Sequence, residues 1–351
     1  MLTGLLDKLK TQTVLEREEY LMLIKNRAQV SDYAAELASG VRDRIYGKKI
    51  YIRGLIEFTN YCRNNCYYCG IRAGNAKADR YRLTPDEIIQ CADAGYELGF
   101  RTFVLQGGED EYYTDDILAM IIKRIRQKYP DCALTLSVGE RSYDSYKRLR
   151  QAGADRYLLR HETVNREHYA SLHPDKMSWE RRIECLHYLK ELGYQTGAGF
   201  MVSSPGQTAE DLADELLFLK ELKPEMVGIG PFIPHRDTPL HAAAPGSAEL
   251  TLFLLSLIRL TLPDVLLPAT TALGTIDPAG REKGIKCGAN VLMPNLSPAD
   301  VRGKYLLYDN KICTGEEAAQ CIECLKNRVS AIGYEIVTDR GDHIDQKGRM
   351  Q

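Results

Sequence analysis

Three cysteines, Cys62, Cys66 and Cys69, follow one another at the spacing C-x3-C-x2-C. Thiolates are the protein ligands of iron–sulfur clusters, and three of them on one short loop can bind three corners of a cubane. The fourth iron then keeps an open position, at which a substrate can bind and receive an electron. The loop is therefore predicted to carry out chemistry rather than to stabilise the fold.

A structural zinc site or a disulfide framework fits these cysteines less well. A structural zinc site needs four closed ligands, and no fourth Cys or His lies nearby in the sequence. Disulfide frameworks are typical of small secreted chains, whereas this chain has 351 residues and ten cysteines. We therefore expect reduced cysteines and a cytoplasmic location.

Composition and charge exclude several classes of partner. The chain is 44% hydrophobic, enough for a large core, and its formal net charge is −2, with basic residues spread along the chain. Such a balance predicts no attraction to nucleic acid or to an anionic membrane. No apolar run approaches the roughly 20 residues of a membrane span, and the N-terminus lacks the apolar stretch of a signal peptide.

Apolar, β-forming runs alternate with amphipathic helical patterns along most of the chain. The strands are expected at 51–58, 102–107, 133–138, 156–161, 196–202, 226–233, 266–272 and 290–293. The main helices between them are expected at 85–98, 115–128, 143–152, 179–192, 209–222 and 248–260. Eight units over about 250 residues predict an α/β fold, a (β/α)8 TIM barrel. A doubly wound open sheet is the alternative.

The chain is predicted to have three parts: an N-terminal helical extension (1–47), the barrel (48–300) and a C-terminal extension with further cysteines (301–351). The active site of a barrel lies at the carboxyl ends of its strands. Polar and glycine-rich segments do follow the expected strands, for example Gln106–Asp110, Arg160–Thr163 and Gly228–His235. We therefore expect one large site at that end.

An iron with an open position can chelate the amino group and the carboxylate of S-adenosylmethionine, and one electron then breaks the sulfonium bond. Gly107, Gly108 and Glu109 can expose backbone carbonyls beside the cluster, because glycine removes the side chain. Glu162 can accept hydrogen bonds from ribose hydroxyls, and Arg182 offers a planar fork for the carboxylate. The alternative for residues 107–109 is a plain strand-to-helix turn, and the alternative for Glu162 and Arg182 is a surface ion pair. Because Arg181 adjoins Arg182, the choice between these two arginines stays open as well.

The C-x3-C-x2-C motif, followed by Gly107-Gly108-Glu109 in a β/α chain, resembles the radical S-adenosylmethionine superfamily. Later segments are similar to one of its families, the maturases of [FeFe]-hydrogenase. These segments are 56–62, 153–163, 228–235, 268–275 and 287–295.

The resemblance implies a complete barrel around a closed cavity. It implies a [4Fe-4S] cluster on the three cysteines, S-adenosylmethionine beside it, and an external electron donor. The 5′-deoxyadenosyl radical would then act in assembly of the di-iron subcluster of the hydrogenase. Its implied substrate is a small iron–cysteine–carbonyl–cyanide complex supplied by another maturase.

The resemblance also assigns binding residues. To the cofactor residues named above it adds Tyr68, Gly228 and Ile229. Its substrate cavity would be lined by Thr135, Ser137, Arg156, Arg160, Thr270, Thr271, Met293, Tyr305 and Tyr308. Inward-pointing arginines and hydroxyls suit an anionic or cyanide-bearing ligand, because a buried arginine without an anion is costly.

A second cysteine trio, Cys313, Cys321 and Cys324, has the spacing C-x7-C-x2-C. It resembles an accessory site of some hydrogenase maturases and could hold a second iron–sulfur cluster, or zinc with one water. The alternative is a set of surface cysteines without metal. We expect an accessory cluster that the radical step does not require.

Three competing functions stay open. The first is a different radical enzyme on the same barrel, of the methylornithine synthase or biotin synthase type. The second is a zinc-dependent hydrolase, disfavoured because only seven histidines occur and most lie outside the strand ends. The third is a carrier that transfers iron–sulfur units without radical chemistry.

Overall fold

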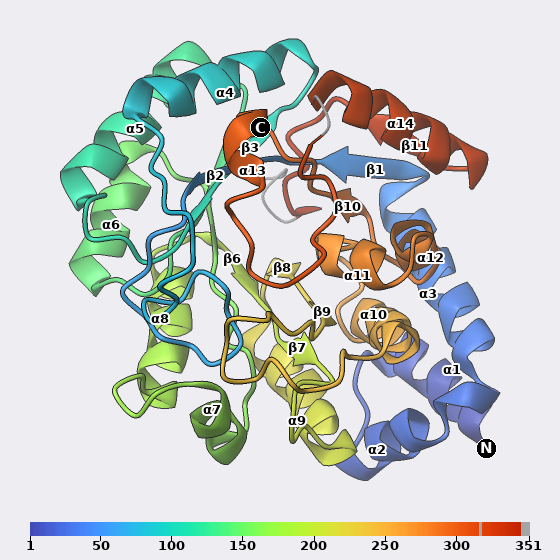
Figure 1. Cartoon of the computed structure of the whole chain (residues 1–351). Helices are drawn as coiled ribbons and strands as arrows, with labels where there is room; N and C mark the ends of the chain where they lie inside the picture. Colours follow the sequence, from blue (N-terminus) through green and yellow to red (C-terminus); the bar gives the residue numbers. More distant parts are fainter. Residues whose placement is uncertain (316–317, 345–351) are drawn as a thin grey trace.

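The computed structural model describes residues 1–315 and 318–344. Its N-terminal part is helical, with α1 (Leu2–Gln12), α2 (Arg17–Lys25), a 3-10 turn (Arg27–Gln29) and α3 (Ser31–Tyr46). Helix α3 packs against α10 and α2 packs against α9, so these helices lie on the outside of the body (Figure 1). Their buried leucines, such as Leu6, Leu9 and Leu23, belong to the main hydrophobic core.

The centre of the molecule is a ring of parallel strands. Six neighbours follow in the order β2 (Gly54–Thr59), β3 (Thr102–Gly107), β4 (Ala133–Ser137), β5 (Arg156–Leu158), β6 (Gln195–Ala198) and β8 (Met226–Val227). Parallel bridges join Met226 to Leu266, Pro268 to Val291 of β10 (Val291–Leu292), and Leu55 to Asn295. The last bridge returns to β2, so the ring closes. The predicted barrel is confirmed, and the open sheet is wrong.

Helices surround the ring, as Figure 1 shows in a view along the barrel. They are α4 (Pro85–Glu97), α5 (Asp115–Lys128), α6 (Tyr143–Ala152), α7 (Arg166–Leu172), α8 (Trp179–Glu191), α9 (Ala209–Leu222), α10 (Ala248–Thr261), α11 (Thr271–Ile276) and α12 (Gly280–Lys286). Helix α4 begins with a capping box, in which Thr84 and Glu87 satisfy each other's backbone N–H groups.

The seventh expected strand, 266–272, is wrong in length and regularity. Leu266 and Pro268 make only isolated bridges, and α11 already begins at Thr271. Pro268 has no backbone N–H to donate to a ladder, which explains the interruption. Two short paired strands, β7 (Met201–Val202) and β9 (Gly230–Pro231), lie beyond the ends of β6 and β8.

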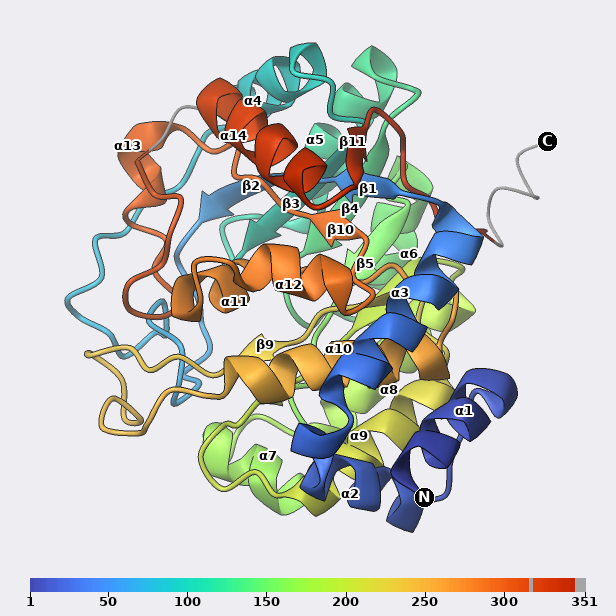
Figure 2. The same cartoon turned by 90° about the vertical axis from the view of Figure 1, so that its right-hand side faces the viewer.

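The C-terminal residues return to both ends of the barrel. After α13 (Ala299–Arg302), residues 303–313, called the strap here, cross the end where the strands finish, together with the loop after β2 (Figure 2). Helix α14 (Ala318–Ala331) then leads to β11 (Glu335–Val337), which pairs with β1 (Lys49–Ile52). The division of the chain at residues 47 and 300 stays a prediction.

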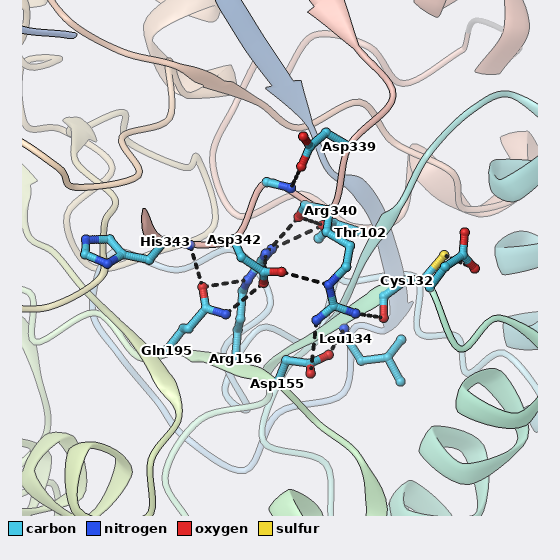
Figure 3. A network of polar contacts seen from close by, with 12 residues as sticks. Thr102, Cys132, Leu134, Asp155, Arg156, Gln195, Asp339, Arg340, Asp342 and His343 are labelled. Carbon is cyan, nitrogen blue, oxygen red and sulfur yellow. Dashed lines mark hydrogen bonds and ion pairs between the residues drawn. The ribbon is translucent and has the colours of Figure 1, made fainter. Parts of the chain in front are cut away.

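The opposite end of the barrel is filled by a polar network (Figure 3). Asp342 accepts hydrogen bonds from Arg156 Nη2 at 2.7 Å, Gln195 Nε2 at 2.8 Å and Arg340 Nε at 2.7 Å. The side chains of Arg156 and Asp342 are 0% and 2% exposed. This network fastens the C-terminal segment to the starts of β5 and β6. Among the described residues, no helix combines the length and apolarity that a membrane crossing requires.

Candidate active site

The cysteine loop lies directly against the end of β3. Arg63 N donates to Glu109 O at 2.9 Å, and Gly108 N donates to Thr59 O at 3.3 Å. A Cβ at Gly108 would overlap the carbonyl oxygen of Tyr61 and come within 2.7 Å of Cys62 Cβ. Glycine at position 108 is therefore required for the close approach of the two loops.

Arg80 ties the two ends of this loop together. Its guanidinium donates to the carbonyl oxygens of Asn60 and Ile71 through Nη1, and to those of Arg72 at 2.7 Å and Asn75 at 3.2 Å through Nη2. These four acceptors lie on both sides of the cysteine motif. One side chain thus fixes the loop ends, because arginine has several donors in one rigid plane.

The three thiols open onto one cavity of about 300 Å3 at the carboxyl ends of the strands. Burial raises the pKa of the Cys62 thiol, raises that of Cys66 to about 12 and raises that of Cys69 well above its usual value. Buried thiols without metal are thus held protonated, and metal binding must release their protons.

Among the described residues, no three His, Cys, Asp or Glu side chains converge closely enough to hold a single metal ion. Three cysteines on one loop fit a cubane, since each thiolate of such a cluster binds a different iron.

Arg182 and Glu162 line the same cavity. Arg182 is buried, donates from Nε to Glu140 Oε1 at 2.6 Å and donates from Nη1 to Arg160 O at 2.8 Å. Its neighbour Arg181 instead pairs with Glu184 on the surface. The structure therefore selects Arg182 as the arginine that faces the cavity.

Glu162 adopts the left-handed backbone conformation, with φ of 69°, although it is not glycine. Its carboxylate Oε2 lies 3.1 Å from Arg160 Nη2, but the two groups are not aligned for a hydrogen bond. A buried residue other than glycine in this strained backbone conformation is typical of a functional position.

Further buried polar atoms in the cavity wall have no hydrogen-bond partner in the described part of the chain. They are Arg160 Nε and Thr270 Oγ1, whereas Arg160 Nη2 and Glu162 Oε2 face each other as an ion pair. Such atoms cost free energy when unsatisfied, so they indicate a polar ligand. Three thiols, with Arg182 and the Glu162 carboxylate on the same cavity wall, fit an iron–sulfur cluster together with S-adenosylmethionine.

Tyr68 also lines the cavity, and its ring is oriented by His173. His173 Nδ1 lies 2.9 Å from the carbonyl oxygen of Tyr169, so Nδ1 carries the proton and Nε2 is left as an acceptor. The Tyr68 hydroxyl donates to that Nε2 at 3.3 Å. Burial lowers the pKa of His173 to about 3, which keeps the imidazole neutral.

Most of the predicted site residues are brought together by the fold. The cavity is lined by Cys62, Cys66, Tyr68, Cys69, Gly107, Gly108, Glu109, Ser137, Arg160, Glu162, Arg182, Thr270, Tyr305 and Tyr308. Glu109 is partly engaged elsewhere, because its carboxylate accepts from Arg63 at 3.1 Å and from the Glu140 backbone N–H at 2.9 Å.

Two residues that were expected to bind substrate lie deeper in the barrel than the cavity. Arg156 stands at the start of β5, where Asp342 satisfies its charge, so the placement of this residue in the cavity is wrong. Thr135 is buried on β4, two residues before the cavity-lining Ser137, and its hydroxyl has no described partner. In both cases the predicted strand is confirmed, and the predicted depth along the strand is wrong.

Four other predicted residues do not line the main cavity. Gly228 and Ile229 connect β8 to β9, and the Ile229 side chain packs in the hydrophobic core; Gly230 to Ile233 reach the cavity instead. Thr271 and Met293 line a smaller neighbouring hollow, because the chain already turns into α11 at Thr271.

Sequence reasoning missed the apolar part of the wall and its cover. Leu158, Leu159, Met201, Phe232 and Leu307 line the cavity. Leu307 belongs to the strap, and its carbonyl accepts from Gly70 N at 2.8 Å. A Cβ at Gly70 would overlap the Leu306 carbonyl, so the glycine after the last cysteine was the signal that another segment packs there.

The second cysteine trio is only partly described. Cys313 ends the strap, with φ of 62°, and Cys324 is exposed on α14. Arg328 lies near both thiols, and its pKa is raised first by Glu282 and further by these two cysteines. The side chain of Cys321 lies outside the described residues. An accessory cluster at this place stays a prediction.

Comparison with known proteins places the chain in a family. The model of the radical SAM superfamily matches residues 56–219. The [FeFe] hydrogenase maturase subunit HydE of Thermotoga maritima is 47% identical over 333 residues, which cover 93% of this chain and 95% of that protein. The 3-methylornithine synthase of Methanosarcina acetivorans is 28% identical over 85% of this chain and 83% of that protein.

Solved structures agree on the barrel. The crystal structure of methylornithine synthase (PylB) has a TM-score of 0.83 at 25% identity and covers 95% of this chain and 97% of that chain. The maturase HydG has a TM-score of 0.79 at 20% identity, over 95% of this chain and 75% of its own, which shows a shared fold. With the site geometry and the identity to the Thermotoga maturase, the chain is a radical SAM enzyme that belongs to the HydE family of [FeFe] hydrogenase maturases.

Proposed function

We propose that this enzyme acts in the assembly of the di-iron subcluster of the [FeFe]-hydrogenase active site. The observation that carries the proposal is one cavity shared by three cluster-type thiols, a buried arginine fork and unsatisfied polar atoms of Arg160 and Thr270. The 47% identity to the Thermotoga maturase supports a role in hydrogenase maturation over other radical reactions.

Radical SAM enzymes use a [4Fe-4S] cluster and S-adenosylmethionine. Cys62, Cys66 and Cys69 would hold the cluster, and the Gly107–Glu109 backbone, Glu162 and Arg182 would hold S-adenosylmethionine. When bound, these groups supply a 5′-deoxyadenosyl radical through reductive cleavage of the sulfonium bond. The protein's own contribution is to orient the groups and to exclude water under the strap.

The substrate proposed for the cavity is a small iron–cysteine–carbonyl–cyanide complex. Arg160 would bind its negative charge, and the hydroxyls of Ser137, Thr270, Tyr305 and Tyr308 would donate hydrogen bonds to carbonyl or cyanide ends. Another maturase would supply this complex, and an external protein would supply the electron. The described cysteines are free thiols, which supports a cytoplasmic location.

Anaerobic incubation of reconstituted protein with S-adenosylmethionine and dithionite tests the radical step. We expect 5′-deoxyadenosine from the wild type and a loss of at least a hundredfold in Cys66→Ser, because a serine hydroxyl is a poor ligand for iron of a cluster. Cys185→Ser is the matched control, since that buried thiol lies on α8 and does not line the cavity. Cleavage that survives in Cys66→Ser would contradict the site.

The second candidate is an amino-acid mutase of the methylornithine synthase type, and the TM-score of 0.83 to PylB favours keeping it. Complementation separates the two functions. Rescue of hydrogenase activity in a strain without its own maturase of this family supports the proposal, whereas conversion of lysine to methylornithine by the purified protein would support the alternative.

A further inference from the structure

The cysteine loop is covered by protein on most sides. Tyr67 N donates to the Leu172 carbonyl at the end of α7 at 2.9 Å, and Leu240 N donates to the Tyr67 carbonyl at 3.3 Å. The strap covers the far end, through the hydrogen bond between Gly70 and Leu307. The Cys66 and Cys69 sides of the loop are thus enclosed.

The Cys62 side is different. Cys62 lines the internal cavity and also a shallow surface depression of about 200 Å3. That depression is lined by Tyr61, Cys62, Arg63, Arg82, Glu109, Asp110, Glu111 and Tyr112. Cys62 and Glu109 thus lie between the cavity and this surface depression.

An exposed stack of aromatic and cationic side chains borders this depression. The guanidinium carbon of Arg82 lies 3.8 Å from the ring centre of Tyr61 and 5.0 Å from that of Tyr112. Tyr61 and Tyr112 are 36% and 51% exposed, and they are two of only seven large hydrophobic side chains exposed in residues 1–315 and 322–344. Tyrosine and arginine side chains in contact at the surface have the composition of interface hot spots, and this group lies beside Cys62.

The buried carboxylate of Asp110 holds the arginine of this stack in place. Arg82 donates from Nε and Nη2 to the two carboxylate oxygens of Asp110, at 2.7 and 2.9 Å. Asp110 is buried, and its Oδ2 also accepts from Thr59 Oγ1 at 2.7 Å. A pre-ordered surface loses little side-chain entropy when a partner binds, and tyrosine and arginine dominate the binding energy of protein interfaces.

We infer that the Tyr61–Arg82–Tyr112 stack is the docking surface for a small electron-carrier protein, one whose flavin or iron–sulfur group lies near its surface. The inference rests on the proposed function, which needs an electron from outside. One electron leaves the reduced carrier and enters the cluster beside Cys62, so the carrier is oxidised and the cluster reduced by one electron, with no bond made or broken.

The test compares two reductants on the reconstituted protein. Dithionite reaches the cluster without docking, whereas reduced flavodoxin, used as the probe carrier, must dock. For Tyr112→Ala we expect the apparent KM for flavodoxin to rise about tenfold, as for loss of an interface hot spot, while dithionite-driven cleavage stays unchanged. Tyr112→Phe should behave as the wild type, because the ring is retained.

Two further variants secure the result. Glu111→Trp places a bulky ring at a position whose side chain is 80% exposed. It should also raise the apparent KM for flavodoxin, while Asp110 and Thr59, which hold Arg82 in place, stay unchanged. Tyr143→Ala is the matched control, since Tyr143 forms an edge pair with Tyr188 at 5.2 Å, much as Tyr112 does with Tyr113 at 5.1 Å. Tyr143→Ala should leave the cleavage of S-adenosylmethionine unchanged with either reductant.

Two readouts do not depend on S-adenosylmethionine: the Kd for flavodoxin by biolayer interferometry, and bleaching of the cluster absorbance on mixing. Unchanged Kd and bleaching rate in Tyr112→Ala and Glu111→Trp would overturn the inference. If the wild type is bleached by flavodoxin in a stack-dependent way but forms no 5′-deoxyadenosine, the proposed function fails and the docking surface stands.

Discussion

At the scale of single residues, the site depends on side chains that shape the cysteine loop as much as on the cysteines. Gly70 and Gly108 let backbone segments approach the loop where a Cβ would overlap a carbonyl oxygen. Arg80 then joins the loop ends through four carbonyl acceptors. The motif supplies the ligands, and these residues supply the geometry.

Replacing Arg80 with lysine tests this role. Lysine keeps the charge but cannot span four carbonyls, and each lost hydrogen bond from a charged donor costs about 1.5–3 kcal/mol. That is at least tenfold in the population of the ordered loop. We expect clearly lower iron and sulfide per chain after reconstitution at limiting iron, measured by metal analysis.

The control for this experiment is Arg124→Lys. Arg124 pairs on the surface with Asp86 at 2.7 Å, and exposed pairs contribute little. Equal iron content in Arg80→Lys and Arg124→Lys would show that the loop does not need the Arg80 clamp.

At the scale of elements, the strap lines one side of the cavity and is anchored by a buried ion pair. Lys311 Nζ donates to Glu57 Oε1 at 2.6 Å and to the Tyr305 carbonyl at 2.9 Å. Asn295 Nδ2 donates to the other oxygen of Glu57 at 2.7 Å. Because Glu57 belongs to β2, this pair fixes the strap to the barrel wall.

For Lys311→Met we expect a loosened strap. The Glu57 carboxylate would stay buried without its cation, and breaking a buried pair costs about 3–5 kcal/mol. Hydrogen–deuterium exchange should therefore accelerate in residues 303–311 and not in α9. The double variant Glu57→Gln with Lys311→Met removes both charges and should recover most of the protection.

Lys283→Met provides the control, because Lys283 pairs with Asp277 in a partly exposed position at 2.7 Å. Unaltered exchange of the strap in Lys311→Met would mean that the backbone contacts to Gly70 and Pro234 suffice to hold it.

At the scale of the whole molecule, the C-terminal segment seals the barrel from the end opposite the site. Asp342 joins Arg156 of β5, Gln195 of β6 and Arg340 in the network of Figure 3. The stability of the barrel therefore depends on residues far along the chain from the strands that they join.

For Asp342→Asn we expect the free energy of unfolding to fall by about 3–5 kcal/mol, since the Arg156 charge would be left buried without its partner. Urea unfolding at neutral pH measures this loss. Asp214→Asn is the control; Asp214 pairs with Arg17, both side chains are about 40% exposed, and such pairs contribute less than about 1 kcal/mol.

The same carboxylate gives a pH dependence of known sign. Burial alone would raise the pKa of Asp342, but Arg156 and Arg340 outweigh burial and hold it well below its usual range. An unfolded aspartate has a pKa of about 3.9, so below that pH the unfolded chain binds the extra proton first. The stabilisation is complete above about pH 5 and is lost as the pH falls.

Asp342→Asn should therefore show a smaller loss of unfolding free energy between pH 5 and pH 3 than the wild type does. Parallel curves for the two proteins over this interval, from urea unfolding at each pH, would show that the carboxylate does not titrate between the folded and unfolded states as described.

Several features could be predicted from the sequence because they depend on short spacings. The three thiols, the glycines at 107 and 108 and the alternation of strands and helices are local patterns, and the closed barrel follows from their number and order. The sequence predicts that an arginine at position 182, or its neighbour at 181, faces the cavity. The structure decides for Arg182, which is buried, whereas Arg181 pairs with Glu184 on the surface.

Depth along a strand and long-range partners were decided only by the tertiary structure. Arg156 and Arg160 are four residues apart in one segment, yet Asp342 binds the first, while the second faces the cavity. The strap reaches the cysteine loop from more than 200 residues away, and no local pattern predicts that contact. Spacing determines which groups can react together; the packing of distant segments decides which of them share a cavity and which neutralise each other inside the core.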